Sequence, residues 1–449
     1  MGSHDGLYAE ADIMGQFPVL NSYSMLAYGF ELPPDVNRDA VVSALQISFD
    51  KLVEQIPWLG WQVATSESGV RTVLPWPHDV AKERVRVKIC DDSIVPMEQL
   101  LAEKVPINRL HGKELCPWPA LPQPHGLTGP APVVALQASF VRGGLIINLT
   151  AHHTVMDGTA DFQFLHLFAT VLNGGEIPAA DLEQANRDRN RLVPLIPHGE
   201  PVKDHSHLRP PPGWKFVMPT SWPTWCYFLM SVASLAEIVK TARDADTESS
   251  SIERISSDDI LSAFYWKRIC ALRLARGMPR DTESKISRAI NARTPLGIPS
   301  SYMGAQVYPA ITRMLMGRVD ELTVPQLARI LRRELLEAAT PWAVRSFATF
   351  IERESPEDRA RLLYTGTHNS NTDVGATNVS RLVTPKGPWG PLLGPCRFYR
   401  RPNTGPIPGA FRIQEPENGA HPIAVCLPEE DLKALKKDEE WGRYATCIG

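Results

Sequence analysis

The chain has 449 residues, which is more than one ordinary hydrophobic core accommodates and predicts about two domains. Hydrophobic residues make up 43% and charged residues 22%, the balance of an ordinary globular protein, and the formal net charge is −3. A charge this close to neutral gives no electrostatic reason to expect nucleic acid or an anionic membrane as a partner.

Cysteine usage and the first residues of the chain bear on its compartment. The seven cysteines are scattered, their number is odd and none forms a CxxC pair, so we interpret them as reduced thiols. Residues 1–12 lack the basic start and apolar stretch of a secretory signal, and no apolar run approaches the roughly 18 residues of a membrane span. The expected location is the cytoplasm, without a membrane partner.

Hydrophobic periodicity predicts the elements of the N-terminal half. Apolar residues recur at spacings of three and four over 36–55, which predicts a helix, and alternation over 85–89 predicts a half-buried strand. Segments 133–141 and 145–150 read as two strands joined in a hairpin near Gly143-Gly144. A further helical face runs over 162–172, and Asn173-Gly174 indicates its end.

The C-terminal half alternates helices and strands less regularly. The expected helices are 231–241, a helix from Ser257 or Asp258 to about Ile269, one opened by a capping box at Thr323, and 429–437; the expected strands are 286–292, 381–383 and 423–427. This irregular alternation favours mixed α/β layers. We interpret the Pro-rich segment 196–215 as a crossover linker between domains of residues 1–195 and 216–449; a surface loop within one domain is the alternative.

A histidine pattern follows the second strand of the predicted hairpin. His152-His153-Thr-Val-Met-Asp157-Gly158 lies between the strand at 145–150 and the helix that ends near 172. Histidine is the only side chain whose ordinary pKa lets it take and return a proton near neutral pH. At a junction of strand and helix such a side chain can project into a cleft, so the pattern indicates an acid–base site.

Acyl transfer from a thioester to an alcohol suits these residue types. A neutral hydroxyl is a weak nucleophile, and a positioned imidazole that removes its proton contributes roughly 10²- to 10⁴-fold in rate. Donors for the oxyanion and close placement of the two substrates supply much of the rest. The sequence contains no GxSxG elbow and no cysteine with the local signature of a nucleophile, which favours direct transfer without an acyl-enzyme.

Several segments resemble the BAHD-type acyltransferases, and the resemblance spans nearly the whole chain. His153 through Gly158 matches the HxxxDG motif of that family. Further segments that resemble family motifs are 255–266, 291–293, 299–304, 388–394 and 438–449. The last of them is similar to the fungal branch that includes trichothecene 3-O-acetyltransferases.

The resemblance implies an α/β fold of two chloramphenicol-acetyltransferase-like domains, with mixed sheets, flanking helices and an active-site channel at their interface. It implies that His153 and Asp157 form the catalytic centre. His153 would be the general base, whereas Asp157 would point away from the substrate and pair with an arginine. The residues expected to support the site are Gly158, which would leave room for substrates, Arg293, the partner of Asp157, and Trp389 and Gly390, whose loop would shape the channel from a distance.

The implied function is an acyl-CoA-dependent O-acyltransferase that modifies a hydroxyl of a fungal-type secondary metabolite. Acetyl-CoA is the expected co-substrate and a small-molecule alcohol the expected acceptor, with no metal, no nucleic acid and a monomeric chain. The sequence leaves the acceptor, the acyl chain length, the residues that contact CoA and the choice between O- and N-acylation open.

The chain departs from the family pattern at three places. Pro388 stands where the late motif has Asp, so an ion pair of the relatives is expected to be absent. Asn291 replaces the Asp of the family's Asp-x-Arg, and Ala305-Gln306 replaces the Asn that follows Tyr-x-Gly. None of these positions lies next to His153 in the sequence.

Other functions fit part of the same pattern. HHxxxDG also matches peptide-synthetase condensation domains, which take acyl groups from carrier proteins, although the ending of the chain favours the free-standing enzyme. A non-transferring paralogue, either a binding protein or a cyclase that uses the same cavity, is a further alternative. The side chains of His152, His153 and Asp157 could also be metal ligands, but no matched Cys/His cluster accompanies them in the sequence.

Individual residues also have structural interpretations. His152 is expected to be structural, because neighbours on a strand face opposite ways. Asp157 could serve only as a helix N-cap, and Arg293 could be a solvated surface residue. Three arginines, Arg397, Arg400 and Arg401, could meet a CoA phosphate, but a solvated basic turn is the favoured interpretation.

Overall fold

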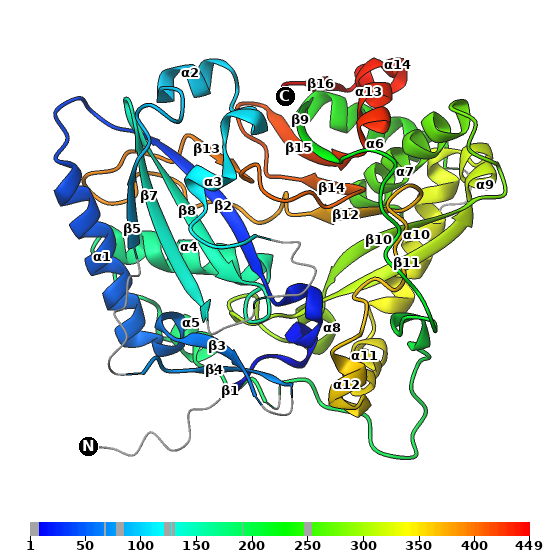
Figure 1. The fold of residues 1–449 in the computed structure, drawn as a ribbon, viewed down its shortest axis with the longest axis horizontal. Helices are drawn as coiled ribbons and strands as arrows, with labels where there is room; N and C mark the ends of the chain where they lie inside the picture. Colours follow the sequence, from blue (N-terminus) through cyan, green and yellow to red (C-terminus); the bar gives the residue numbers. More distant parts are fainter. Residues whose placement is uncertain are drawn as a thin grey trace.

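The computed structural model describes residues 9–66, 69–77, 85–120, 127, 131–190, 192–246 and 254–449. Within these residues the strands form three sheets, which Figure 1 shows spread across two halves of the molecule. The expected α/β class with mixed sheets and flanking helices is confirmed.

The central sheet of the N-terminal half has five strands among the described residues. In order across the sheet they are β13 (Phe398–Arg400), β2 (Tyr23–Glu31), β8 (Gly144–His152), β7 (Val134–Val141) and β5 (Val85–Ile89). The predicted hairpin is present as β7 and β8, with Gly143 at a positive φ of 74° in the turn. Side chains alternate between the two faces of β8, so Leu149 and Ala151 enter the main core and His152 faces the other way.

A smaller sheet lies beside it, with β1 (Ala9–Glu10), β4 (Arg71–Leu74), β3 (Gln62–Thr65) and β6 (Ala131–Pro132) in that order among the described residues. Helices α1 (Arg38–Gln55) and α4 (Gly158–Leu172) pack on one face of the five-stranded sheet, and together they enclose the largest apolar core. The remaining helices of this half are α2 (Met97–Ala102), α3 (Gly112–Leu115) and α5 (Ala179–Ala185).

The C-terminal half is built on a seven-stranded sheet of described residues. Its strands, in order, are β11 (Val307–Leu315), β10 (Glu283–Asn291), β12 (Val374–Asn378), β14 (Ala410–Ile413), β15 (Ala420–Leu427), β9 (Thr224–Ser231) and β16 (Ala445–Cys447). Helices on one face complete its core: α6 (Val232–Asp244), α7 (Ser257–Ala275), α9 (Met316–Glu321), α10 (Val324–Ala338), α13 (Glu429–Lys437) and α14 (Glu439–Gly442). Three more helices are α8 (Arg293–Leu296), α11 (Pro341–Arg353) and α12 (Pro356–Arg359).

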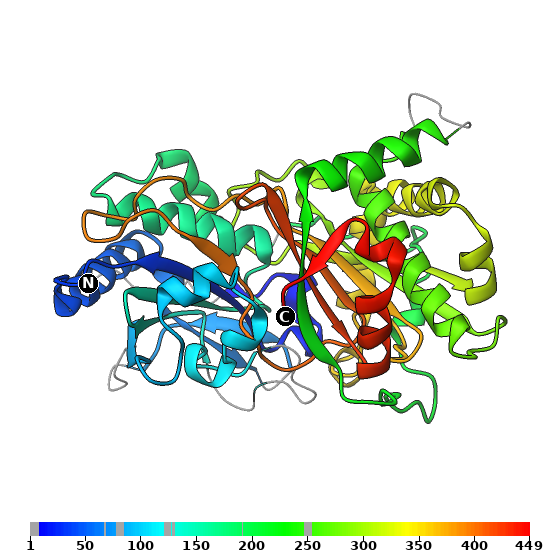
Figure 2. The same ribbon diagram turned by 90° about the horizontal axis from the view of Figure 1, so that it is seen from above.

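Each half contributes a segment to the other. Strand β13, from late in the sequence, pairs antiparallel with β2 and so extends the N-terminal sheet. Conversely, the short 3-10 helices at Ile13–Gln16 and Pro18–Leu20 pack against β11 and α11. Figures 1 and 2 both place this early segment at the centre of the molecule, between the halves. The predicted boundaries at 195 and 216 stay a prediction, but the two halves are interlocked.

Two local predictions differ from the structure. Residues 381–383 form no strand, so that prediction is wrong. The Leu382 amide donates to the Val379 carbonyl in a turn over 379–382, and β12 lies earlier in the chain. Helix α7 is capped by Ser256 rather than by Ser257 or Asp258, because Ser256 and Asp259 exchange hydrogen bonds in a capping box. The predicted capping box at Thr323 is confirmed.

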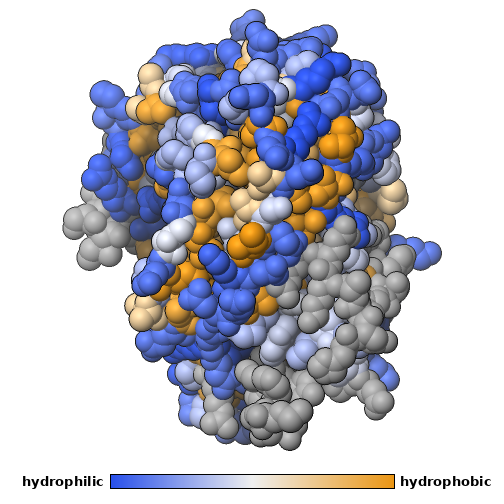
Figure 3. Space-filling model, turned by 90° about the vertical axis from the view of Figure 1, so that its left-hand side faces the viewer, coloured by the Kyte–Doolittle hydropathy of each residue, from blue (hydrophilic) through white to orange (hydrophobic). Residues whose placement is uncertain are grey.

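The surface and composition of the described part add three observations. No helix among the described residues is long and apolar enough to span a membrane. All seven cysteines are free. On the side where α1 and β5 lie, Figure 3 shows a band of apolar surface between hydrophilic regions. Ile47 of α1 and Val87 and Ile89 of β5 are exposed.

Candidate active site

The histidine pattern occupies the turn that joins β8 to α4. His152 is the last residue of the strand, and the amides of Val155 and Met156 donate back to its carbonyl, which closes a tight turn. The His153 amide donates to the Ser22 carbonyl at 2.8 Å, and the Thr154 hydroxyl donates to the Leu20 carbonyl at 3.1 Å. The turn is therefore fixed on one side by the early segment that lies between the two halves.

His153 has the exposure and charge state of a proton acceptor. The residue is partly exposed, whereas its Nδ1 is buried and has no hydrogen-bond partner in another described residue. Burial lowers the pKa of the imidazole below its ordinary value of 6.5. The positive charge of Arg412 also lowers this pKa, whereas the negative charge of Asp157 raises it. The ring is consequently neutral at physiological pH, and Nε2 is the nitrogen left to exchange a proton.

His152 has a different environment. Its side chain is fully buried, both ring nitrogens lack partners among the described residues, and its ring meets Tyr23 edge-on at a centroid distance of 5.1 Å. Burial lowers its pKa to about 3, so it stays neutral. These contacts agree with the expected structural role.

Asp157 turns away from the surface into a buried network. It caps α4, since its Oδ1 accepts from the Ala160 amide at 3.0 Å. Its carboxylate also accepts from the two Nη atoms of Arg293, at 2.7 and 3.1 Å, and from the Gln306 amide at 2.8 Å. Burial alone would raise the pKa of Asp157, but the charge of Arg293 and these hydrogen bonds hold it below its ordinary value.

Arg293 is the arginine that the resemblance implied as the partner of Asp157, and it is buried rather than solvated. Its side chain is 2% exposed, and it also donates to the carbonyls of Tyr302 and Gly304. Asn291 contacts Arg293 directly, because its Oδ1 accepts from the backbone amide and from Nη1 of Arg293. Thus the departure at 291 leaves the ion pair in place.

Gly158 begins α4 and is partly exposed. A Cβ added there would meet only Leu382 at 3.7 Å and Val379 at 3.9 Å, which are ordinary contacts. An alanine would therefore fit against the protein itself, and the space beside Gly158 is free on the side away from these two residues.

The loop of Trp389 and Gly390 lies at the other end of α4. Trp389 is buried against Tyr28 and Phe30, with ring centroids 5.7 and 5.1 Å away. Gly390 has a φ of +76°, and an added Cβ would meet the Leu172 backbone at 2.9 Å. Asn173, which ends the helix, donates to the Pro388 carbonyl and accepts from the Gly390 amide.

The predicted basic turn at 397–401 is not solvated. Arg400 and Arg401 are 1% and 5% exposed. Arg400 pairs with Glu417 at 2.9 Å, and Arg401 lies over the Trp225 ring and donates to Thr404. Only Arg397 of the three is exposed, and it pairs with Glu31. We therefore assign no phosphate-binding role to Arg400 or Arg401.

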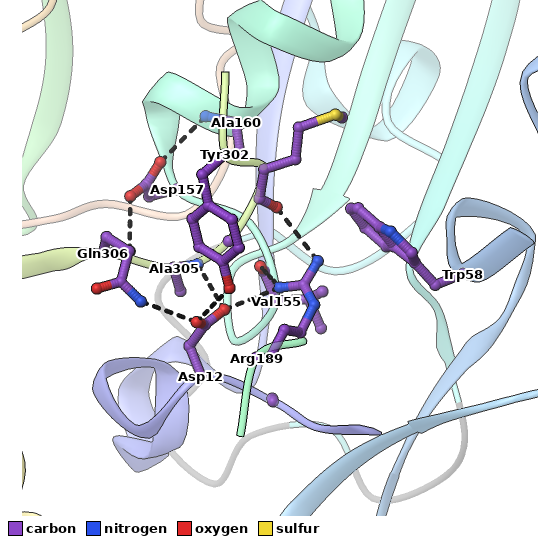
Figure 4. Close-up of polar contacts among 12 residues, drawn as sticks. Asp12, Trp58, Val155, Asp157, Ala160, Arg189, Tyr302, Ala305 and Gln306 are labelled. Carbon is purple, nitrogen blue, oxygen red and sulfur yellow. Dashed lines mark hydrogen bonds and ion pairs between the residues drawn. The ribbon is translucent and has the colours of Figure 1, made fainter. Parts of the chain in front are cut away.

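A second buried ion pair, which no pattern in the sequence indicated, lies close to the pair of Asp157 and Arg293. Asp12 and Arg189 pair at 2.8 Å with side chains 1% and 4% exposed, and Figure 4 shows them beside Gln306 and the turn at Val155. Asp12 stands between the apolar residues Ala11 and Ile13, which is a sign that its side chain could be buried. Its partner Arg189, however, lies 177 residues away in the sequence. No local pattern connects two such positions.

Gly15 is a further position that the sequence did not single out. A Cβ there would come within 1.9 Å of the Thr154 carbonyl oxygen, so only glycine permits the early segment to approach the histidine turn this closely. Among the described residues, no group of three or more His, Cys, Asp or Glu is placed to hold a metal ion. The expectation of a metal-free enzyme stays a prediction.

Comparisons with known proteins bear on the family of the chain. The model of the trichothecene 3-O-acetyltransferase-like N-terminal domain matches residues 22–171, and that of the transferase family matches residues 120–441. The chain is 37% identical to the O-acetyltransferase SAT5 of Stachybotrys chartarum, over 98% of this chain and 95% of that protein. It is 35% identical to the O-acyltransferase pigD of Monascus ruber, over 98% of each chain.

Solved structures show the same fold. The crystal structure of Fusarium sporotrichioides TRI101 complexed with coenzyme A and T-2 matches with a TM-score of 0.88 at 25% identity, over 99% of this chain and 100% of that one. A condensation domain of the calcium-dependent antibiotic synthetase reaches a TM-score of only 0.51 at 15% identity. Sequence and fold lead to one conclusion: the chain belongs to the BAHD transferase family and is an acyltransferase.

Proposed function

We propose that the protein is an acetyl-CoA-dependent O-acetyltransferase that acts on a hydroxyl of a small secondary metabolite, with His153 as the general base. The observation that carries the proposal is the contrast within one turn. His153 is partly exposed and neutral, whereas Asp157 is turned into a buried ion pair with Arg293. The proposed base and its structural support thus lie four positions apart in the sequence, with three residues between them.

The reaction follows from this geometry. The acceptor hydroxyl gives its proton to Nε2 of His153 as its oxygen attacks the thioester carbonyl carbon of the donor. The tetrahedral intermediate collapses, the carbon–sulfur bond breaks, and the departing thiolate takes the proton from the imidazolium. The burial that lowers the pKa of His153 makes the imidazolium readily give up its proton. No group of the protein becomes acylated.

The relatives support the choice of donor and acceptor. Curated relatives that match nearly the whole chain are named O-acetyltransferases, and Fusarium sporotrichioides TRI101 has been crystallised with coenzyme A together with T-2. We expect this chain to use an acyl-CoA, with acetyl-CoA as the specific donor. A small-molecule alcohol is the expected acceptor, and a monomer in the cytoplasm is the expected state.

The test is product formation from a mixed pool of fungal alcohols and amines with acetyl-CoA. Mass spectrometry would follow free CoA and acetylated products, with longer acyl-CoA donors and an acylated carrier protein in parallel reactions. An O-acetylated product formed from acetyl-CoA would support the proposal. Transfer only from the carrier protein would favour a condensation-type enzyme, and binding of pool members without transfer from any donor would favour a non-transferring paralogue.

A further inference from the structure

The buried pair of Asp12 and Arg189 is hydrogen-bonded to the backbone of the histidine turn. Nη1 of Arg189 donates to the Val155 carbonyl at 3.1 Å and to Asp12 Oδ2 at 2.8 Å. Val155 lies two residues after His153, in the turn that aims the imidazole. The guanidinium carbon of Arg189 also lies over the Trp58 ring, 4.3 Å from its centroid, which is the range of a cation–π contact. Asp12 and Trp58 therefore fix the position of the Arg189 guanidinium, and the guanidinium in turn fixes the Val155 carbonyl of the histidine turn.

Asp12 anchors this arginine to the C-terminal half. Besides Arg189, its carboxylate accepts from the Tyr302 hydroxyl at 2.6 Å, the Ala305 amide at 3.1 Å and Gln306 Nε2 at 2.8 Å. Figure 4 shows these donors converging on Asp12 from the loop at 302–306. Gly304 is required by this approach, since an added Cβ would lie 2.4 Å from Asp12 Oδ2.

The two arginines hold the same short loop from both sides. Arg293 donates to the carbonyls of Tyr302 and Gly304, and Arg189 donates to the carbonyl of Met303 between them. Both guanidinium carbons lie 5.8 Å from the centroid of the Tyr302 ring. The pairs are also joined through Gln306, whose backbone amide donates to Asp157 and whose side chain donates to Asp12.

We propose that Asp12 and Arg189 are positioning residues for His153: they lock the Val155 carbonyl to the loop at 302–306 and so fix the imidazole across the boundary of the two halves. The inference rests on the proposed function, in which His153 is the base. A small displacement of a reacting group costs up to about 100-fold in rate, so a loosened turn lowers kcat without removing any group that touches substrate.

The experiment compares Arg189→Met with a matched control. Arg273 and Asp431 form another buried pair, 2.9 Å apart with side chains 0% and 3% exposed, between α7 and α13 and outside the site. Arg189→Met takes the counter-charge from the buried Asp12, and Arg273→Met takes one of two arginine partners from the buried Asp431, which keeps Arg276. Both variants therefore lower the thermal midpoint. Only Arg189→Met is expected to lower the kcat of the folded enzyme, by about 10- to 100-fold, with KM for acetyl-CoA unchanged.

A double variant separates positioning from stability. In Asp12→Asn/Arg189→Met no buried charge is left unpaired, so the thermal midpoint recovers in part, while kcat stays low because nothing holds the Val155 carbonyl. Recovery of kcat in step with the midpoint would overturn the inference, and so would equal kcat values for the folded Arg189→Met and Arg273→Met enzymes.

An activity-independent readout distinguishes failure of this inference from failure of the proposed function. In protein with isotope-labelled histidines, the ring signals of His153 are identified by their absence in His153→Ala. We expect them to shift in Arg189→Met and to remain in place in Arg273→Met. Absence of transfer by the wild type would contradict the proposed function alone, whereas unmoved His153 signals in Arg189→Met would overturn the positioning role.

Discussion

The two ends of α4 carry two of the sequence motifs, and they differ in what they can do. The end at Asp157 presents a partly exposed, neutral imidazole beside a buried ion pair. The end at Asn173 meets the Trp389 loop through backbone hydrogen bonds and apolar packing. The fifteen residues of the helix span about 22 Å at 1.5 Å per residue. The late motif thus fixes the far end of the helix and stands well away from the proposed base.

The largest effect is expected at the chemical end. His153→Ala removes the proton acceptor but no buried hydrogen bond of the side chain, so the fold should persist. We expect kcat to fall by roughly 10²- to 10⁴-fold, the usual contribution of general base catalysis. Steady-state CoA release and circular dichroism would check this, and a folded variant with undiminished kcat would remove His153 from the mechanism.

Loss of the ion pair between Asp157 and Arg293, which supports the His153 end of α4, is expected to lower both stability and activity. Asp157→Asn leaves the Arg293 guanidinium buried without its counter-charge, which costs about 3–5 kcal/mol in comparable buried pairs. Urea unfolding would measure the loss. Glu321→Gln is the matched surface control, since Glu321 and Arg318 are 55% and 59% exposed and such pairs contribute about 0–1 kcal/mol. Equal losses in the two variants would contradict the structural role of Asp157.

The far end of α4 should affect stability with little effect on chemistry. Gly390→Ala adds a Cβ 2.9 Å from the Leu172 backbone at a positive φ, and such crowding costs about 1–3 kcal/mol. We expect a lower thermal midpoint and an unchanged kcat in the folded enzyme. Gly394→Ala, where an added Cβ meets nothing within 4 Å, is the control. A kcat loss as large as that of His153→Ala would show that this loop takes part in the reaction.

The pH dependence of kcat/KM sharpens the assignment of the base. A base must be neutral, so activity falls as pH drops through the pKa of His153, by about tenfold for each further unit. Because burial holds this pKa below 6.5, the acidic limb should have its midpoint below pH 6.5. A midpoint above that value would indicate a different base or a different environment for His153.

The smallest effect is expected one turn into the helix. Burial raises the pKa of Asp161 to about 8, so its carboxyl, which accepts from the Ser24 hydroxyl, is protonated at neutral pH and resembles an amide. Asp161→Asn should therefore leave kcat unchanged. The raised pKa stabilises the wild type below pH 3.8, and this contribution is lost as pH rises through about 8. The thermal midpoint of the variant relative to wild type should consequently be higher at pH 9 than at pH 6, and an equal difference at both values would refute the assignment.

Local signals predicted the histidine turn and six of the longer helices, which are α1, α4, α6, α7, α10 and α13, but they did not predict α11 or the short helices. The periodicity of α1, the capping box of α10 and the hairpin of β7 and β8 depend on residues near one another in sequence, and all three are present. The partner of Asp157 came from the resemblance rather than from any spacing. The strand predicted at 381–383 is wrong, because the chain turns there instead of pairing with another strand.

Contacts between distant segments could not be predicted in the same way. The placement of β13 beside β2 depends on pairing across the two halves, and the pair of Asp12 with Arg189 joins the beginning of the chain to the end of its first half. The burial of Arg400 and Arg401 likewise depends on partners that come from other strands and loops. A single sequence carries no local pattern for such contacts.

The most direct test of the account is a single-turnover reaction of the wild type with acetyl-CoA and its acceptor, quenched at successive times and analysed by mass spectrometry of both product and intact protein. Direct transfer with His153 as base predicts that the acetylated product appears in one phase while the mass of the protein stays unchanged. An acetyl group that appears on the protein and then passes to the product would contradict it.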